Sequence, residues 1–389
     1  MDGYTQFILK SQNGKLITTA KVFLFVILQI FLSICGIAQQ KNGRDSIQPK
    51  VIFTGLFQAR YLVSLTKDVD VMGLHHPDGN GVSNTFDVRR ARAQFTARIS
   101  DRTEAVLLVN LADFKSDPKN KVLENAYLTY RLNPLMQFKI GQFRPAFGLE
   151  DTYSVNIIKS FDYSNQYTSF GTNGWQSFQI GLGMFGDFKG AIPFRYELDV
   201  VNGNNKNQVS DDDNGKQVTL RFQIEPVKKI KIGINAGYGA RNKEKIYAAG
   251  IDLSAILPLQ NKFSLEFDAE YKRGNNHALF FSLDTLLRNG NINDYQMSGY
   301  YFLPNLRYNI NFRRLTSIEL SCRYEYLNTD VNNQDNPQQT LTPMIGFEFL
   351  KAYNARIQIG IVSDWYKKNI ISTNTNKRSL FILQVQTKM

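Results

Sequence analysis

Residues 51–65 read VIFTGLFQARYLVSL, and apolar and polar side chains alternate along this stretch. Its odd positions are Val, Phe, Gly, Phe, Ala, Tyr, Val and Leu, whereas Thr, Gln, Arg and Ser fall at even positions. Successive side chains of a β-strand point to opposite faces, so a period of two predicts a strand with one apolar and one polar face. The same period recurs at 228–241, 263–271 and 355–361.

Sixteen segments of this kind follow one another along the chain. Most are longer than the roughly 5–6 residues usual for soluble strands, and several match the ~9–11 residues that a tilted strand needs to cross a bilayer. The even count is typical of single-chain outer-membrane barrels. The sequence therefore predicts an all-β fold, a transmembrane antiparallel up-and-down β-barrel of 16 strands over residues 51–389. The predicted strands are 51–65, 85–99, 103–114, 121–132, 136–144, 175–188, 191–203, 215–226, 228–241, 245–257, 261–274, 294–308, 313–327, 339–350, 354–366 and 377–389.

The connections between these segments alternate in length, with one short exception at 242–244. Short turns on the periplasmic side and long loops outside are the asymmetry of transmembrane barrels. Trp175 and Trp365 are predicted at the outer rim, where amphipathic rings sit at the lipid–water interface. A soluble all-β protein is the alternative, but its inward positions would be the apolar ones. The predicted long loops are 66–84, 115–120, 145–174, 204–214, 275–293, 328–338 and 367–376.

The N-terminus has the pattern of a secretory signal peptide. Three lysines precede an apolar run at 22–38 that ends in small residues. We expect residues 1–38 to be cleaved before Gln39 and residues 39–50 to form a short periplasmic segment, which places the mature chain in a Gram-negative outer membrane. A retained membrane anchor and a lipid-modified Cys35 are the alternatives.

Composition narrows the classes further. Lys and Arg number 46 against 34 Asp and Glu, a net charge of +12 that favours an anionic partner. The basic residues are spread along the predicted strands rather than gathered in one patch, which argues against nucleic-acid binding. The only apolar run near membrane-spanning length is the N-terminal one, so a polytopic helical membrane protein is excluded.

Several segments together resemble the phosphate-selective porin O and P family. They are FDVRRAR at 86–92, LENAY at 123–127, IGQFRPAFGLE at 140–150, YELDVVNG at 196–203, GYY at 299–301 and RYE at 323–325. The resemblance covers roughly residues 50–389. It implies a homotrimer of sixteen-stranded porins whose basic residues line an anion path. It also implies a third outer loop, here 145–174, that folds into the lumen and narrows it.

Face assignment along the strands places many basic side chains inward. Arg90, Arg92, Gln94, Thr96 and Arg98 share one face of one strand, about 7 Å apart at successive inward positions. Guanidinium groups can meet an oxyanion with two donors, so such a row offers a series of weak sites. Arg89 is out of phase with this row and is left out. The predicted pore-lining residues are Arg60, Arg90, Arg92, Arg98, Arg131, Lys139, Arg221, Lys231 and Arg323.

An alternative is that these bases pair with inward carboxylates and stiffen the barrel. Eleven inward acids oppose fourteen inward bases in the face assignment, and Glu266, Asp268 and Glu270 make one wall acidic. A segregated field is therefore as consistent with the pattern as an anion filter.

The predicted constriction loop 145–174 mixes charged and aromatic residues. Its rings can pack in the lumen while its charges face solute, and an exposed cap is the alternative. Pro145 and Gly148 favour a sharp turn where the chain leaves the wall. The charged residues predicted at the constriction are Arg144, Glu150, Asp151 and Lys159.

The function that these patterns favour is a porin for passive diffusion of small polar solutes, with a weak preference for phosphate-like anions. Its expected partners are outer-membrane lipid and small inorganic or organic anions. No enzyme, metal or cofactor is predicted, because the histidines, His75, His76 and His277, lie in outer loops without a catalytic spacing. The acidic run at 211–213 is interpreted as solvated. A non-conducting structural or adhesion barrel and a hydrolase active at the rim are the rival classes.

Overall fold

The computed structural model describes residues 49–115, 122–208, 210–288, 290–332 and 336–389. The predicted signal peptide, and the following segment up to residue 48, lie outside the described residues. Among the described helices, none is both long enough and apolar enough to cross a membrane.

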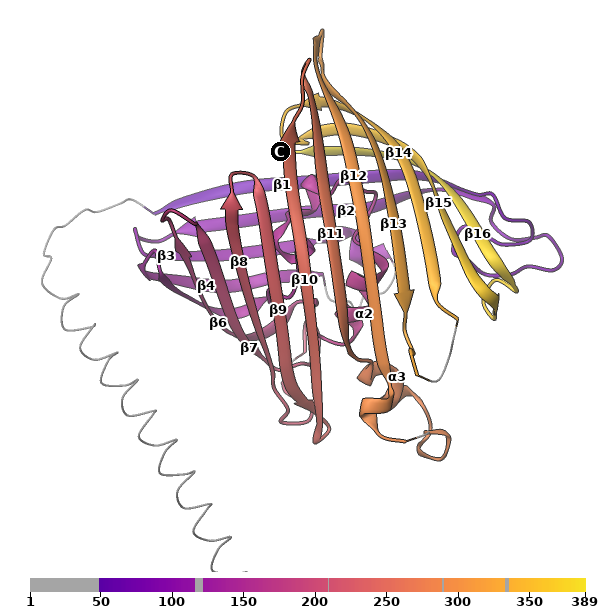
Figure 1. The fold of residues 1–389 in the computed structure, drawn as a ribbon, viewed down its shortest axis with the longest axis horizontal. Helices are drawn as coiled ribbons and strands as arrows, with labels where there is room; N and C mark the ends of the chain where they lie inside the picture. The colour runs from indigo at the N-terminus through magenta and orange to yellow at the C-terminus, as the bar shows by residue number, and fades with distance from the viewer. Residues whose placement is uncertain (1–48, 116–121, 209, 289, 333–335) are drawn as a thin grey trace, which may run out of the picture. The chain divides into compact units, whose positions relative to one another are not determined.

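The described part of the chain forms one closed barrel of sixteen antiparallel strands, each hydrogen-bonded to its neighbours in sequence (Figure 1). The ring closes between the first and last strands, where Leu56 pairs with Lys388 and Ser64 with Leu380. The predicted fold class and strand number are confirmed. The strands are β1 Lys50–Ser64, β2 Asn84–Arg98, β3 Thr103–Asn110, β4 Leu123–Asn133, β5 Met136–Phe143, β6 Gln179–Phe188, β7 Phe194–Val201, β8 Gln217–Val227, β9 Ile230–Arg241, β10 Glu244–Pro258, β11 Phe263–Asn275, β12 Gln296–Phe312, β13 Leu315–Asn328, β14 Gln338–Leu350, β15 Ala355–Ile370 and β16 Thr375–Lys388.

The outer face of the barrel is apolar and the inner face is polar. In β13, Leu320 is 62% exposed, whereas its neighbours Glu319 and Ser321 are buried. In β9, Ile234 is exposed and Asn235 is buried. A soluble sheet would bury its apolar positions, so this arrangement excludes the soluble alternative and matches a surface that faces hydrocarbon.

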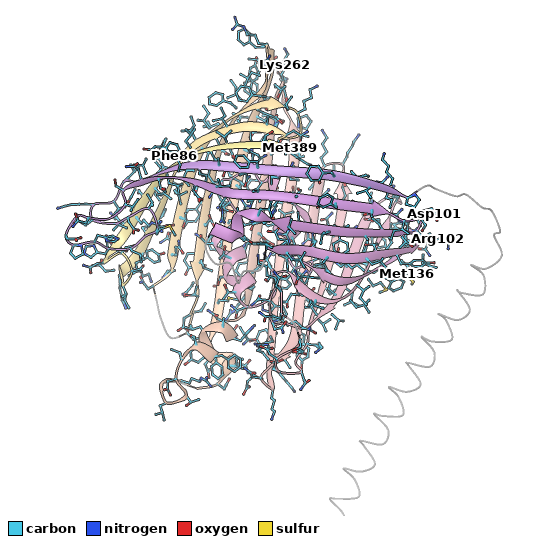
Figure 2. The ribbon with its side chains drawn as sticks, turned by 180° about the vertical axis from the view of Figure 1, so that it is seen from behind. Phe86, Asp101, Arg102, Met136, Lys262 and Met389 are labelled. Atoms are coloured by element: carbon cyan, nitrogen blue, oxygen red, sulfur yellow. The ribbon has the colours of Figure 1, made fainter. Side chains whose placement is uncertain are left out.

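Short turns gather at one end of the strands. Figure 2 shows Asp101, Arg102 and Met136, which lie in or beside two short turns, at one end of β2–β5 and Phe86 at the opposite end. Helical segments occur in the longer connections of the described chain: η1 Leu111–Lys115, η2 Glu150–Thr152, η3 Val155–Ile157, α2 Asn165–Thr172, α3 His277–Ser282, η4 Thr285–Leu287 and η5 Ile292–Asp294. The helix α2 lies within the ring of strands (Figure 1).

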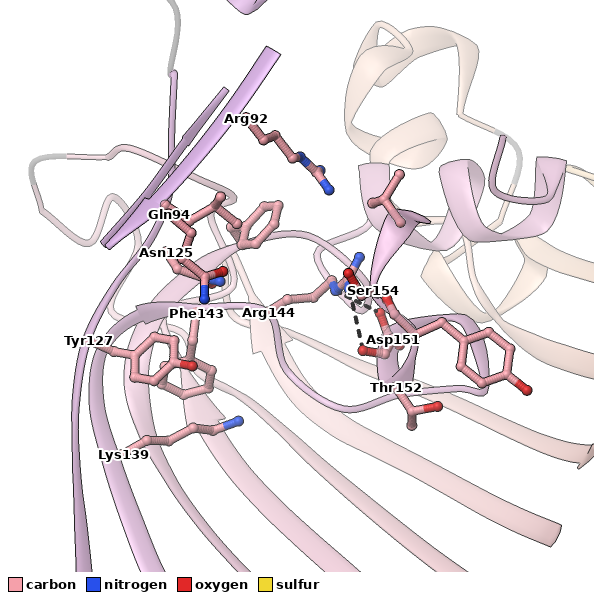
Figure 3. Close-up of a pocket in the computed structure, with 14 residues that line it drawn as sticks. Arg92, Gln94, Asn125, Tyr127, Lys139, Phe143, Arg144, Asp151, Thr152 and Ser154 are labelled. Carbon is pink, nitrogen blue, oxygen red and sulfur yellow. Dashed lines mark hydrogen bonds and ion pairs between the residues drawn. The ribbon is translucent and has the colours of Figure 1, made fainter. Parts of the chain in front are cut away.

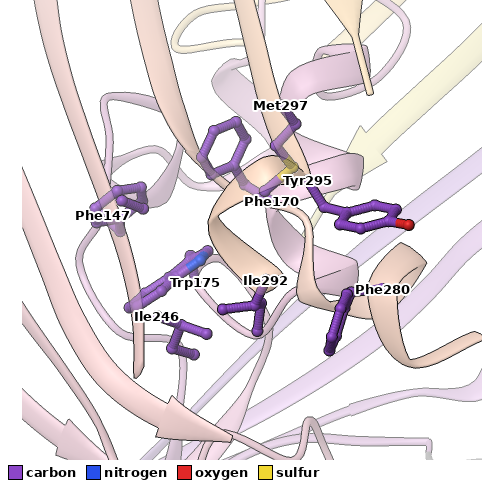
Figure 4. Close-up of a cluster of buried hydrophobic side chains, with 9 residues drawn as sticks. Phe147, Phe170, Trp175, Ile246, Phe280, Ile292, Tyr295 and Met297 are labelled. Carbon is purple, nitrogen blue, oxygen red and sulfur yellow. The ribbon is translucent and has the colours of Figure 1, made fainter. Parts of the chain in front are cut away.

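The two tryptophans occupy different environments. Trp365 packs its ring 6.3 Å from that of Tyr324, an outward-facing residue of β13. The prediction that Trp175 lies at the lipid interface is wrong. Trp175 is fully buried in a cluster with Phe147 and Met297, on the inner side of the barrel (Figure 4).

A glycine of the wall makes room for this buried ring. A Cβ added to Gly237 of β9 would lie 2.6 Å from the Trp175 ring. The sequence predicts a strand from residue 175, but β6 begins only at Gln179. Residues 175–178 are the last part of the loop that precedes β6. Trp175 therefore lies on the inner side of the barrel rather than in its wall.

Candidate solute path

The connection between β5 and β6 packs against the inner face of the barrel. The Ala146 amide donates to Asp199 Oδ2 of β7, and the Leu149 amide donates to Glu270 Oε1 of β11, each at 2.9 Å. Between them, Gly148 has a φ of 159°, and a Cβ there would lie 2.2 Å from Glu270 Oε1. A glycine is therefore needed where the chain runs this close to the wall.

Farther along, the loop covers the acidic wall. Lys159 Nζ lies 3.0 Å from Asp268 Oδ2 and 3.2 Å from Glu266 Oε2 of β11. The Asn165 amide, at the start of α2, donates to Glu325 Oε2 of β13 at 2.6 Å. All three carboxylates are buried. The loop thus neutralises and shields the most acidic part of the inner face.

Three arginines converge on one loop carboxylate. Asp162 pairs with Arg60 Nη1 at 3.2 Å, Arg89 Nε at 2.7 Å and Arg90 Nη2 at 2.5 Å. Burial by itself would raise the pKa of Asp162, but the guanidiniums of Arg90, Arg60 and Arg89 hold it well below its ordinary value. Arg89 joins this cluster because a bulge in the pairing of β1 with β2 breaks the strict alternation that had excluded it.

Arg144 is held by rings and by backbone. Its Nη1 donates to the hydroxyls of Tyr163 at 2.9 Å and Tyr167 at 2.6 Å, and these two rings stack with centroids 4.0 Å apart. Its Nε lies 3.4 Å from Asp151 Oδ1, and the guanidinium sits 5.6 Å from the Phe178 ring. Burial raises the pKa of Asp151 although Arg144 opposes the shift.

Glu150 joins two parts of the loop. Its carboxylate accepts bonds from the Ser164 amide at 2.9 Å and the Ser164 hydroxyl at 2.5 Å, and Ser164 is the N-cap of α2. Burial raises the pKa of Glu150 to about 8, with Arg323 opposing the shift and Glu270 adding to it. Only 4% of Glu150 is exposed, so it fastens the loop rather than facing solvent.

Two cavities remain between the loop and the wall formed by β2–β5. The outer one holds about 450 Å³ and reaches the long-loop end, where Asp113 and Lys206 line it. The inner one holds about 280 Å³ (Figure 3). Arg92, Arg144 and Phe178 line both cavities, and we call these three residues the neck.

Of the two basic residues of the neck, Arg92 has fewer hydrogen-bond partners. Its Nη2 donates to Glu124 Oε1 at 2.7 Å. Its Nε is buried, and no described residue accepts a hydrogen bond from it. Figure 3 shows Arg144 joined to Asp151, whereas no dashed line joins Arg92 to another residue drawn.

Other predicted pore residues are paired with carboxylates. Lys139 lines the inner cavity, contacts Glu197 and lies 3.1 Å from Asp199. Arg221 is 3% exposed and bonds to Asp252 through both terminal nitrogens. Lys139 and Arg221 therefore fit the alternative in which inward basic residues pair with inward carboxylates and stiffen the barrel.

The remaining predicted residues are split between the loop and the ends of the barrel. Arg323 Nη1 donates to the Asp162 carbonyl at 2.7 Å, so it helps to hold the loop. Arg98 is exposed at the end of β2, with Nε 3.5 Å from Glu104. Arg131 and Lys231 line a third cavity, of about 520 Å³, at the short-turn end. The three arginines of this row thus lie in different places: Arg90 at the loop carboxylate Asp162, Arg92 in the neck and Arg98 at the end of β2.

Comparisons with known proteins agree with this architecture. The model of the family described as phosphate-selective porin O and P matches residues 65–380. No curated protein sequence matches the chain significantly.

Solved structures match the chain over most of its length. The outer membrane channel DcaP of Acinetobacter baumannii is 11% identical with a TM-score of 0.55, over 89% of this chain and 99% of that one. The anion-selective porin from Comamonas acidovorans is 8% identical with a TM-score of 0.53, over 88% and 100%. The trimer form of OmpT, an outer membrane protein of Vibrio cholerae, is 10% identical with a TM-score of 0.53, over 88% and 99%. At these identities the likeness concerns the fold alone, whereas the family match spans most of the chain. The chain therefore belongs to the phosphate-selective porin O and P family.

Proposed function

We propose that this outer-membrane porin passes small polar solutes by diffusion and prefers anions. The observation that carries the preference is the position of the loop. It covers the carboxylates of Glu266, Asp268 and Glu325, and the cavities that it leaves open lie against β2–β5. The basic residues that these strands contribute to the lining are Arg89, Arg90, Arg92 and Lys139.

The charges that line the cavities also favour anions. In each cavity, basic residues outnumber acidic ones by two among the described residues. The outer cavity has Arg89, Arg90, Arg92, Arg144 and Lys206 against Asp113, Glu124 and Asp162. The inner cavity has Arg92, Lys139 and Arg144 against Asp151. The short-turn cavity has Arg131, Lys189, Arg195 and Lys231 against Asp187 and Glu225.

Partial neutralisation of the basic residues by neighbouring carboxylates favours the conduction of anions. A solute ion must be attracted strongly enough to enter and weakly enough to leave. Guanidiniums that already have carboxylate partners give shallow sites, and low-dielectric walls focus the remaining positive field along the path. Loop 145–174 acts as the constriction in this proposal, with Arg144 and Asp151 beside the path and with Glu150 and Lys159 as its fastenings.

Recording from the purified mature barrel in a planar lipid bilayer tests this proposal. A porin shows discrete open steps, and the reversal potential in a KCl gradient gives the sign of the preferred ion. We expect chloride to be preferred over potassium. A silent bilayer would favour the structural or adhesion barrel, and a cation preference would contradict the role of the covered acidic wall.

The proposal extends to export and assembly. Residues 1–38 direct export and are removed before Gln39, and three copies of the barrel associate. The trimer form of the Vibrio cholerae protein supports this for the fold only. Mass spectrometry of the protein recovered from outer membranes tests the cleavage site, and light scattering of the detergent-corrected complex tests the number of copies.

A further inference from the structure

We propose that the neck is a subsite for organic anions that carry a flat apolar ring beside a carboxylate. In this subsite Arg92 takes the carboxylate and Phe178 contacts the ring. The inference rests on the proposed anion preference and narrows it to a class of solute.

Arg92 has donors to offer. Among the described residues, Nη2 is the one nitrogen of its guanidinium with a hydrogen-bond partner, Glu124. The buried Nε therefore lacks an acceptor, which is costly for a charged group. Nη1 has no hydrogen-bond partner among the described residues and is not one of the buried atoms, so it is the donor that a carboxylate oxygen entering the neck would meet. Guanidinium–carboxylate hydrogen bonds are among the stronger ones, because both partners are charged.

Arg144 has fewer free hydrogen-bond donors than Arg92. Its Nη1 is already bonded to two tyrosine hydroxyls, and its Nη2 contacts the carbonyls of Asp151 and Tyr153 at 3.3 and 3.4 Å. The neck thus has one guanidinium with free donors rather than a pair. This arrangement suits a single carboxylate better than an ion such as phosphate, whose several charged oxygens need more donors.

Polar side chains make up most of the lining of the inner cavity, and rings and apolar side chains form the remainder. Phe178 is part of the lining of both cavities. Beyond it, the inner cavity is lined by Tyr127 and Phe143, whose rings meet edge to face with centroids 6.3 Å apart, and by Leu108 and Val155. A strongly hydrated ion gains nothing from these surfaces. A solute with an apolar ring gains both the burial of that ring and an aromatic contact.

The test compares two anions that share a carboxylate and differ in the ring. Benzoate and acetate are each placed opposite chloride across a bilayer that contains the full mature barrel, and reversal potentials give their relative permeabilities. We expect benzoate to exceed acetate, although benzoate diffuses more slowly in water. The Phe178→Ala variant should lower the benzoate-to-acetate ratio about fivefold, roughly as expected when one face of a phenyl ring loses its contact. Phe178→Leu, which keeps an apolar side chain without the ring, should fall between the two.

Two controls separate this effect from general damage. Phe302→Ala removes a ring from the outward face of β12, where Phe302 is 46% exposed, and should leave the ratio unchanged. Arg92→Gln should reduce the permeability of both carboxylates relative to potassium.

The outcomes distinguish the two proposals. A parent barrel that prefers chloride over potassium but passes acetate as well as benzoate overturns the ring subsite and leaves the anion preference standing. An unchanged ratio in Phe178→Ala, with the open steps retained, also overturns the subsite. A parent barrel that prefers cations overturns both.

Discussion

Lys159 of the loop places its ammonium 3.0 Å from the Asp268 carboxylate of β11, and both side chains are buried. A buried carboxylate without its cation is expensive, so this contact helps to hold the loop against β11. In this position the loop covers the acidic side chains that a solute would otherwise meet.

Replacing Lys159 with methionine should loosen the loop and expose the acidic wall. We expect the free energy of unfolding to fall by about 3–5 kcal/mol, the usual cost of leaving a buried charge without its partner. Single-channel conductance should rise and the anion preference should weaken. Urea titration in lipid vesicles and bilayer recording measure these changes. Lys67→Met is the matched control, because the Lys67 side chain is 93% exposed in an outer loop. Unchanged selectivity in Lys159→Met would contradict the shielding role.

The Asp162→Asn variant should have the opposite effect on selectivity. The carboxylate of Asp162 is shared by Arg60, Arg89 and Arg90, so its replacement removes one negative charge from the lining of the outer cavity and deprives three guanidiniums of their shared partner. We expect a larger chloride-to-potassium permeability ratio and a noisier open state, since the loop loses a fastening. Asp101→Asn, in an exposed turn, is the control. An unchanged ratio would mean that these arginines do not act on the permeating ion, and a lower ratio would contradict the proposed sign of their effect.

The strands could be predicted from sequence because the bilayer imposes a simple rule on each one. A side chain such as Leu320 must face hydrocarbon while Glu319 faces the lumen, and this leaves a period of two in the sequence. The rule needs no knowledge of distant contacts, so the strand number and most boundaries followed from it.

The loop could not be predicted in the same way. The partners of Lys159 and Asp162 lie on strands far away in the sequence, and no local pattern identifies them. The bulge that brings Arg89 into register is a one-residue irregularity, and β2 carries no glycine or proline to mark it. Trp175 and Phe178 belong to the loop, although they directly precede a strand and the sequence predicts that the strand begins at residue 175.

The buried aromatic cluster leads to a prediction on stability. Trp175→Ala should lower the free energy of unfolding by about 3–5 kcal/mol, since a large buried ring is removed and the surrounding residues fill the space only in part. Trp365→Ala, on the outward face, should cost less. Urea midpoints of both variants in the same vesicles provide the comparison. Equal losses would contradict the assignment of Trp175 to the anchored inner cluster.

Glu150 gives the loop a dependence on pH. Its pKa is about 8 in the folded chain, against 4.5 for an unperturbed glutamate, so the folded protein holds this proton more tightly than the unfolded chain does. Between these two values the folded state binds more protons, and its stability must therefore fall as the pH rises from about 4.5 to about 8. Asp162 has the opposite sign, because its lowered pKa contributes stability that is lost only on acidification below the ordinary value of 3.8. The pH range in which Glu150 affects stability therefore does not overlap the range in which Asp162 does.

The Glu150→Gln variant isolates this effect. Glutamine keeps an acceptor for Ser164 but cannot ionise, so the decline above pH 4.5 should be smaller in the variant than in the parent. Hydrogen exchange of the Ser164 and Tyr167 amides, corrected for intrinsic rates, reports the loop, and the urea midpoint reports the barrel. We expect the parent and the variant to diverge as the pH approaches 8, with the larger difference at the loop amides. Parallel pH profiles would show that Glu150 does not ionise in that range, and the fastening between Glu150 and Ser164 would then be independent of pH.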